Sequence, residues 1–193
     1  ERYGVPSLPR SEHIARAEPK AQIYALVQPK MLKDAQKHAA RLEGARLELL
    51  TGDVVDMHLG LSGEEYQRLC ERVTDVFHLA AISNLGAPKE TAWRVNVDGT
   101  RNMLELARDC EKLRRFNYFS TCYVSGDGLG VNAEDELDRG QAFRNPYEET
   151  KFQAEKIVQR ASASLPVTIY RPCSVVGDSR TGEIDRFERP YYL

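Results

Sequence analysis

Short apolar runs alternate with longer helix-forming segments from residue 22 onward. The runs are about six residues long and lie at 22–27, 45–50, 75–81, 115–120 and 166–171. Apolar runs of this length, bounded by prolines, glycines and polar residues, predict buried strands. The segments between them predict helices, which lie at 30–42, 62–73, 88–113 and 147–161.

Cap residues support these boundaries. Gly44 is placed to end the first of the helices, and Ser62 and Glu65 have the spacing of a capping box at the start of the second. The stretch before residue 22 contains three prolines and predicts only a short helix at 11–17. The regular alternation therefore begins with the strand at 22–27.

Strands that alternate with helices predict an α/β fold with a doubly wound parallel sheet covered on both faces. In such sheets, ligands bind where the C-terminal ends of the strands meet the loops. The residues directly after each strand are therefore the candidates for chemistry. The stretch at 125–146 is long and irregular, and a loop of that length typically covers a site.

Composition excludes several classes of function. The 193 residues suffice for one well-packed domain, and the formal net charge of -2 provides no basic footprint for nucleic acid or an anionic membrane. No apolar run approaches the roughly 20 residues of a membrane span, and the N-terminus lacks a signal-peptide pattern. We expect a cytoplasmic protein with no nucleic-acid partner and no membrane span.

The cysteines and histidines predict no metal site. None of them forms the close pairs that metal-binding motifs use. We interpret the four cysteines as buried free thiols of an intracellular protein; they are Cys70, Cys110, Cys122 and Cys173.

Tyr147 and Lys151 form a candidate acid/base pair at the start of the last predicted helix. Positions i and i+4 share one face of a helix, so the phenol and the ammonium group point to the same side. A cation beside a phenol lowers the pKa of the phenol, which favours proton transfer near neutral pH. Taken alone, the pair also fits an exposed helix turn, and the surrounding motifs decide between the two interpretations.

Polar and small residues follow the other predicted strands. An amide, a carboxylate and a glycine also interrupt the long predicted helix, where none of them is favoured. The complete set of motifs is Thr51-Gly52-Asp53, His78-Leu79-Ala80-Ala81, Asn96-Val97-Asp98-Gly99-Thr100, Ser120-Thr121 with Val124 and Gly126, Tyr147 with Lys151, and Arg171-Pro172.

In order and spacing, this set resembles the extended short-chain dehydrogenase/reductase superfamily, over roughly residues 22–178. The resemblance implies a Rossmann-like fold and a nicotinamide cofactor. The tail at 177–185 looks most like the branch of thioester and fatty-acyl reductases, which act on carrier-bound or coenzyme-A acyl groups.

The resemblance also implies roles for individual residues. Tyr147 would be the acid/base, Lys151 its pKa-lowering partner and a ligand of the nicotinamide ribose, and Thr121 the hydroxyl that polarises the substrate oxygen. The implied cofactor-binding positions are Gln28, Lys30, Asp53, Val54, Ala80, Ala81, Asn96, Tyr147, Lys151 and Pro172.

The segment after the first predicted strand bears on the choice of cofactor. An acidic residue there would bind the ribose 2′-hydroxyl of NAD, whereas a basic residue would accommodate the 2′-phosphate of NADP. The sequence reads Val27-Gln28-Pro29-Lys30, with no carboxylate and one lysine. This favours NADP over NAD, although a lysine at a helix start is commonly only solvated.

The chain departs from the family pattern at both ends. The superfamily begins with a strand that enters a Gly-x-x-Gly-x-x-Gly turn, but upstream of residue 22 there is only Gly4, and the run at 126–130 has the wrong spacing. We therefore expect a fragment, with residues 1–178 as a dinucleotide-binding domain that lacks its first strand. Residues 179–193 would then begin a substrate-binding lobe.

Three functions remain open at this level. The first is a reductase of a carbonyl or acyl-thioester group on a small-molecule or carrier-bound substrate. The second is a nucleotide-sugar epimerase or dehydratase, and the third is a non-catalytic binding or scaffold relative. The resemblance also predicts a possible homodimer, paired through the helices at 88–113 and 147–161.

Overall fold

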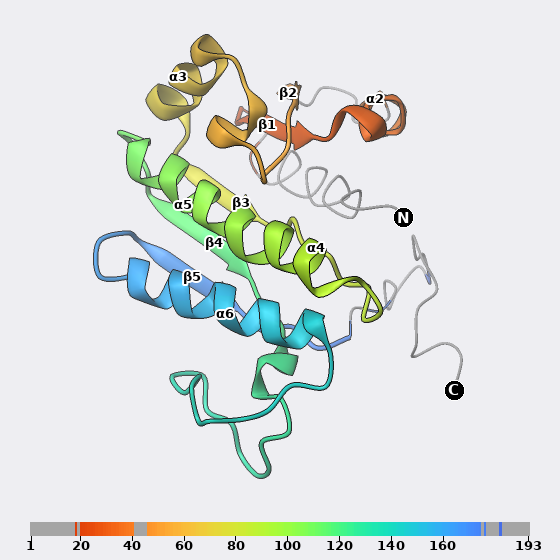
Figure 1. Cartoon of the computed structure of the whole chain (residues 1–193). Helices are drawn as coiled ribbons and strands as arrows, with labels where there is room; N and C mark the ends of the chain where they lie inside the picture. Colours follow the sequence, from red (N-terminus) through yellow and green to blue (C-terminus); the bar gives the residue numbers. More distant parts are fainter. Residues whose placement is uncertain (1–17, 19, 41–45, 175, 177–181, 183–193) are drawn as a thin grey trace.

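The computed structural model describes residues 18, 20–40, 46–174, 176 and 182. The helix predicted at 11–17, the helix end at Gly44 and nearly all of the tail at 177–185 lie outside these residues. In the described part, parallel strands alternate with helices along the chain (Figure 1).

The first two strands form a parallel pair. β1 (Gln22–Val27) lies beside β2 (Arg46–Thr51). Between them, η1 (Pro29–Met31) leads into α2 (Leu32–Ala39), which packs against β2. The strand predicted at 22–27 is confirmed residue for residue, and the proline two positions later ends it because proline has no N–H to donate to a ladder.

A close backbone approach follows β2. A Cβ atom at Gly52 would lie 2.2 Å from the carbonyl oxygen of Leu59, in the 3₁₀ turn η2 (Met57–Gly60). Leu59 also accepts a hydrogen bond from the backbone N–H of Asp53 at 2.9 Å. The glycine is therefore fixed by the lack of space for any side chain.

The predicted capping box is present at α3 (Gly63–Arg72). The hydroxyl of Ser62 accepts from the backbone N–H of Glu65 at 3.2 Å, and the carboxylate of Glu65 accepts from the backbone N–H of Ser62 at 3.0 Å. These two bonds satisfy N–H groups that the first turn of a helix leaves free.

The remaining strands form a second parallel sheet. β3 (Asp75–His78) pairs with β4 (Arg115–Phe119), which pairs with β5 (Val167–Tyr170). The prediction that the first of these strands continues to Ala81 is wrong. Ala80 and Ala81 lie in the loop beyond it. The backbone of the next residue, Ile82, is hydrogen-bonded by the side chain of Asn96 rather than by a neighbouring strand.

The helix predicted at 88–113 is divided into three parts. α4 (Lys89–Trp93) passes into a π-helical turn, η3 (Arg94–Asp98), and then into α5 (Gly99–Asp109). The predicted helix is therefore divided at the residues that an ordinary helix disfavours, and the helical part ends four residues earlier than predicted. Single π turns are frequent at functional sites, and this one contains Asn96.

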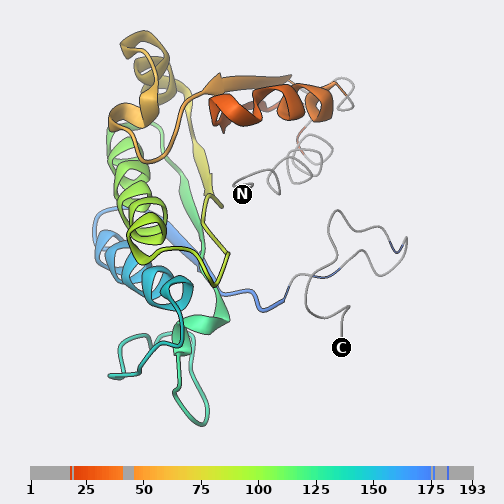
Figure 2. The same ribbon diagram turned by 45° about the vertical axis from the view of Figure 1, so that its right-hand side comes forward.

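α6 (Pro146–Ala161) completes the described helices. It lies beside α5, and α4, α5 and α6 together cover one face of the second sheet (Figures 1 and 2). The core between these layers contains Leu104, Phe116 and Val158, all with no exposed surface. The opposite face of this sheet leaves Phe77 and Tyr170 each more than two-fifths exposed.

The described strands form two sheets, in the orders β1-β2 and β3-β4-β5. The order of a full Rossmann sheet is 3-2-1-4-5-6. β1 and β2 correspond to strands 2 and 3 of that order, and β3, β4 and β5 correspond to strands 4, 5 and 6. No described strand corresponds to strand 1, which would lie between β1 and β3. This is the position at which the sequence predicted an incomplete sheet.

The loop after β2 connects the first pair of strands to α5. The side-chain amide of Asn102 donates to the carbonyl oxygens of Val54 at 2.7 Å and Asp56 at 3.2 Å. A Cβ atom on Gly99 would lie 2.8 Å from the side chain of Val54. The glycine in the interrupted helix therefore permits close contact between this loop and α5.

Candidate active site

The start of α6 fixes the position of Tyr147. Asn145 is the N-cap, and its side-chain oxygen accepts from the backbone N–H of Glu148 at 3.0 Å. The side-chain amide of Asn145 in turn donates to the carboxylate of Glu148 at 2.9 Å. Pro146 occupies the first helical position, which it favours. Tyr147, half-buried, thus projects from a rigid first turn.

Lys151 lies one turn further along α6 and is almost fully buried. Its Nζ atom donates to the carbonyl oxygen of Phe119 at 2.6 Å and lies 4.4 Å from the ring centroid of Tyr118. Both contacts are with the last residues of β4. The lysine therefore joins the helix to the carboxyl end of the central strand of the second sheet.

The surroundings of Lys151 favour its neutral form. Burial lowers the pKa of the lysine from its ordinary 10.5 to about 7, although the nearby Glu155 acts in the opposite direction. Burial, and secondarily the charge of Lys151, also lowers the pKa of His78 to about 3. His78 is therefore a neutral interior histidine at physiological pH, and its Nε2 lies 2.9 Å from the hydroxyl of Thr100.

Thr121 lies two residues beyond Phe119, at the same carboxyl edge. It is 3% exposed and forms the N-cap of η4 (Cys122–Ser125), where its hydroxyl accepts from the backbone N–H of Tyr123 at 3.3 Å. The structure thus places Thr121 and Lys151 at one strand end, with Tyr147 on the helix turn before the lysine.

Asn96 joins two parts of this edge. Its side-chain oxygen accepts from the backbone N–H of Ile82 at 2.7 Å, and its amide donates to the carbonyl of Ile82 at 3.1 Å. The same amide donates to the hydroxyl of Thr150 at 2.9 Å. Asn96 therefore holds the loop containing Ala80 and Ala81 against α6, at the residue before Lys151.

Two candidates from the cofactor-binding set meet near β1. The amide of Gln28 donates to the carboxylate of Asp53 at 2.6 Å, and the other carboxylate oxygen accepts from the backbone N–H of Val55 at 3.2 Å. The Oε1 atom of Gln28 is buried, without a hydrogen-bond partner among the described residues. Lys30 is exposed in η1, and Val54 is buried against α5.

Glu155 and Arg171 form a buried ion pair that sequence reasoning missed, next to Ser120, the residue before Thr121. Glu155 is fully buried, and one of its carboxylate oxygens accepts from Nε and Nη2 of Arg171 at 2.9 Å and 2.6 Å. Its other oxygen accepts from the hydroxyl of Ser120. The available signal was spacing, because Glu155 is four residues after Lys151 and eight after Tyr147 and so shares their helix face.

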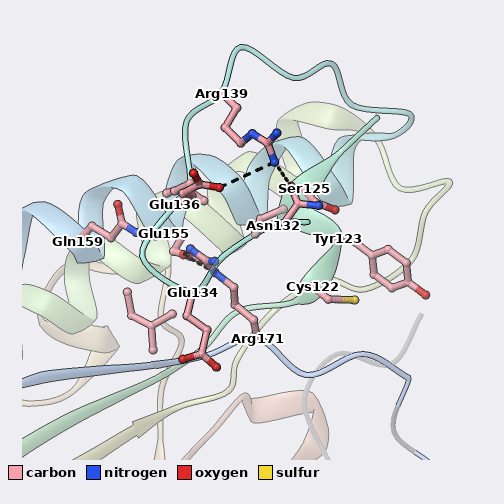
Figure 3. A pocket seen from close by; sticks show the side chains of 13 residues that line it. Cys122, Tyr123, Ser125, Asn132, Glu134, Glu136, Arg139, Glu155, Gln159 and Arg171 are labelled. Carbon is pink, nitrogen blue, oxygen red and sulfur yellow. Dashed lines mark hydrogen bonds and ion pairs between the residues drawn. The ribbon is translucent and has the colours of Figure 1, made fainter. Parts of the chain in front are cut away.

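A cavity of about 610 Å³ opens beside this pair, under the loop that follows η4 (Figure 3). Carboxylates and an arginine from the loop face it, together with residues of α6 and β5. Those named in the figure include Glu134, Glu136, Arg139, Glu155 and Arg171. The long loop thus lies over a cavity, and its predicted role as the cover of a site stays a prediction.

Candidate metal ligands and membrane spans were sought in the described residues. Among them, no three His, Cys, Asp or Glu side chains lie close enough to hold a metal ion. Within the same part of the chain, every helix is too short or too polar to cross a bilayer.

The fold and the site define a Rossmann-like α/β protein, with polar side chains gathered at the carboxyl ends of its parallel strands. A family model, NAD_binding_4, described as Male sterility protein, matches residues 12–193. The chain belongs to this family, and the sequence-based assignment to the extended short-chain dehydrogenase/reductases is confirmed.

Known proteins resemble the chain in sequence and in structure. It is 28% identical over 225 residues to the fatty acyl-CoA reductase wat of Drosophila melanogaster, covering 93% of this chain and 43% of that protein. The terminal R domain from the myxalamid PKS-NRPS biosynthetic pathway has a TM-score of 0.78 and 33% identity, covering 91% of this chain and 48% of that one.

A third likeness shows the fold alone. UDP-glucuronic acid 4-epimerase from Bacillus cereus, in complex with NAD, has a TM-score of 0.69 and 21% identity, covering 91% of this chain and 56% of that chain. In all three comparisons, this chain spans roughly half the length of the relative.

Proposed function

We propose that this chain is the dinucleotide-binding part of an NAD(P)-dependent reductase that acts on an acyl thioester or a related carbonyl group. The observation that carries the proposal is the hydrogen bond from Lys151 to Phe119, which holds the lysine at the strand end that leads to Thr121. Tyr147 lies one helix turn away on the same face. These are the groups that a hydride transfer to a carbonyl needs from a protein.

The residues present fit a dinucleotide. Gln28 has a buried acceptor atom with no partner among the described residues, at the end of β1 where a ribose hydroxyl or an adenine amine could donate to it. Ala80 and Ala81 have the smallest side chains that a non-glycine residue can have, so they would let a flat ring approach the backbone closely. No carboxylate directly follows β1, which favours NADP over NAD.

The division of labour follows from the chemistry of the groups. The cofactor would supply the hydride. Thr121 would donate a hydrogen bond to the substrate oxygen, and Tyr147 would transfer the proton that this oxygen needs. Lys151 would lower the pKa of the phenol while protonated. Asn96 would hold the loop after β3 in position against α6.

The substrate class comes from the relatives. One is a fatty acyl-CoA reductase and another an R domain from a PKS-NRPS pathway. We therefore propose an acyl group carried on coenzyme A or on a carrier protein. A nucleotide-sugar epimerase is the alternative, supported by a fold likeness at 21% identity.

The test is the substitution Tyr147→Phe in the full-length protein, with NADPH and NADH as cofactors and acyl-CoA or UDP-sugars as substrates. We expect turnover of acyl-CoA by the wild type and its loss in the variant, with cofactor binding retained in calorimetric titration. Tyr66→Phe is the matched control, because its hydroxyl bonds Asp109 on the distant end of α5. Full activity in Tyr147→Phe would refute the assignment, and a folded wild type that binds neither cofactor would indicate a scaffold protein.

Three further predictions have their own measurements. We propose that residues 1–178 belong to the dinucleotide-binding domain and 179–193 to the start of a substrate-binding lobe. Limited proteolysis of the full-length protein would locate the boundary between the two.

A homodimer through α4, α5 and α6 would appear in light scattering. Cytoplasmic localisation would appear in cell fractionation.

A further inference from the structure

Two thiols meet where the loops after β4 and β5 come together. The Sγ atoms of Cys122 and Cys173 lie 2.7 Å apart, against roughly 2.0 Å in a disulfide bond. The backbone N–H of Cys122 also donates to the carbonyl of Pro172 at 3.0 Å, which fixes the approach of the two segments. The sequence prediction of four buried thiols is therefore wrong for this pair, because Cys122 is partly exposed and Cys173 is exposed.

We propose that Cys122 and Cys173 are a redox-active pair that forms a reversible disulfide. The proposal is independent of the function proposed above, since it requires neither cofactor nor substrate. The two residues are 51 positions apart in sequence, so the bond would close a long loop that includes α6. It would tie the first residue of η4 to the segment after β5.

The oxidant would be a small-molecule disulfide such as oxidised glutathione. The thiolate of Cys173 attacks one sulfur of this disulfide, forms a mixed disulfide and releases one glutathione thiolate. The thiolate of Cys122 then attacks the Cys173 sulfur and releases the second glutathione. In total, two protein thiols are oxidised to one disulfide, and one glutathione disulfide is reduced to two thiols.

The order of attack follows from access. Cys173 is exposed, so small molecules reach it. Burial, together with the neighbouring Cys173, raises the pKa of Cys122 to about 11. Cys122 is therefore a poor first nucleophile, but it is held in position for the second, intramolecular step.

The other two cysteines serve as an internal reference. Cys70 and Cys110 are both buried, and burial raises the pKa of Cys110 to about 12. Neither is accessible to a small-molecule disulfide in the folded protein. If the thiols reacted because the protein had unfolded, Cys70 and Cys110 would react as well.

A disulfide would act directly on the loop that carries Thr121. Cys122 is the next residue, and Thr121 caps the short helix to which Cys122 belongs. Figure 3 shows the sulfur of Cys122 turned away from Arg171, and Cys122 is one of the residues that line the cavity, so the bond would form at the edge of the cavity. It would restrict the opening of residues 121–126.

The experiment treats the full-length protein with oxidised glutathione under native conditions, blocks the remaining thiols and maps the peptides by mass spectrometry. We expect a peptide crosslink between Cys122 and Cys173 that dithiothreitol reverses, with Cys70 and Cys110 blocked only after denaturation. Amide hydrogen exchange of residues 121–126 should slow in the oxidised protein.

The variants Cys173→Ser and Cys122→Ser separate the two steps. We expect Cys173→Ser to show no crosslink and a Cys122 that stays reduced, and Cys122→Ser to retain glutathione on Cys173. Cys173 is on the surface, so its variant is expected to fold even if the other does not. A wild type in which both thiols stay free, or in which each carries its own glutathione, would overturn the proposal.

Discussion

The Nζ atom of Lys151 and the carbonyl oxygen of Phe119 are joined by a hydrogen bond of 2.6 Å in the interior of the protein. The bond attaches the second turn of α6 to the last residue of β4, and it positions the lysine nitrogen at the edge where Thr121 begins the next loop. A buried lysine is costly unless its hydrogen-bonding groups are satisfied. This one is held by a backbone carbonyl and an aromatic ring, with Glu155 nearby.

Lys151 should make the stability of the protein depend on pH. Its pKa is lowered from 10.5 to about 7 in the folded state, so between these two values the unfolded chain binds more protons than the folded one. Stability therefore rises with pH across that window. In urea unfolding, the wild type should gain stability relative to Lys151→Met from pH 7 to 10.

Lys112→Met is the matched control for the loss of one positive charge, because this lysine is exposed and bonds a surface carbonyl. Parallel stability curves for the wild type and Lys151→Met throughout this pH range would contradict the prediction.

Asn96→Ala should destabilise the fold by about 2–4 kcal/mol, because it leaves the buried N–H and C=O of Ile82 without partners. The loop after β3 should then loosen, which amide hydrogen exchange would show at residues 80–83. Asn132→Ala, at an exposed loop asparagine, should change the free energy of unfolding by less than about 0.5 kcal/mol. Equal effects of the two substitutions would argue against Asn96 as a connection between loop and helix.

Glu155→Ala should cost about 3–5 kcal/mol, because it leaves the largely buried guanidinium group of Arg171 without its carboxylate. The double variant Glu155→Leu with Arg171→Met should cost less than the sum of the single variants Glu155→Leu and Arg171→Met. For comparison, the exposed pair of Lys89 and Glu149 should contribute less than about 1 kcal/mol. Additive effects in the double-mutant cycle would show that the buried pair is not coupled.

Two glycines provide opposite predictions. Gly52→Ala should destabilise by several kcal/mol, since its Cβ atom would overlap the carbonyl oxygen of Leu59. A Cβ atom at Gly63, in the first turn of α3, would meet no atom within 4 Å. Gly63→Ala should therefore stabilise the fold by about 0.4–1 kcal/mol, because alanine reduces the conformational freedom of the unfolded chain. Thermal unfolding of both variants checks the pair, and a Gly52→Ala protein as stable as the wild type would mean that the turn after β2 can open.

Local signals were enough to predict most of the elements. Prolines, glycines and the Ser62 capping box act through neighbouring backbone, so their effect is contained in a few residues of sequence. The strand at 22–27 and the start of α6 were predicted for this reason. The interruption at Asn96 and Gly99 was also visible, as residues that an ordinary helix disfavours, but the π turn that it produces was not.

Contacts between distant segments were not predictable. Glu155 was overlooked because its partners, Ser120 and Arg171, are 35 and 16 residues away, and no local rule connects them. The meeting of Cys122 with Cys173 depends on how β4 and β5 pair. Pairing is decided by burial of whole strand faces, which one segment does not encode.

The sequence by itself determined the fold class, the family and the set of strand-end residues, because periodicity, caps and motif spacing are local properties. Only the tertiary structure decided which of those residues touch. It placed Lys151 against Phe119, Gln28 against Asp53, and two thiols within bonding reach. The physical reason is that a parallel sheet gathers the ends of strands that are far apart along the chain, and the packing of helices on one face then selects which side chains are buried there.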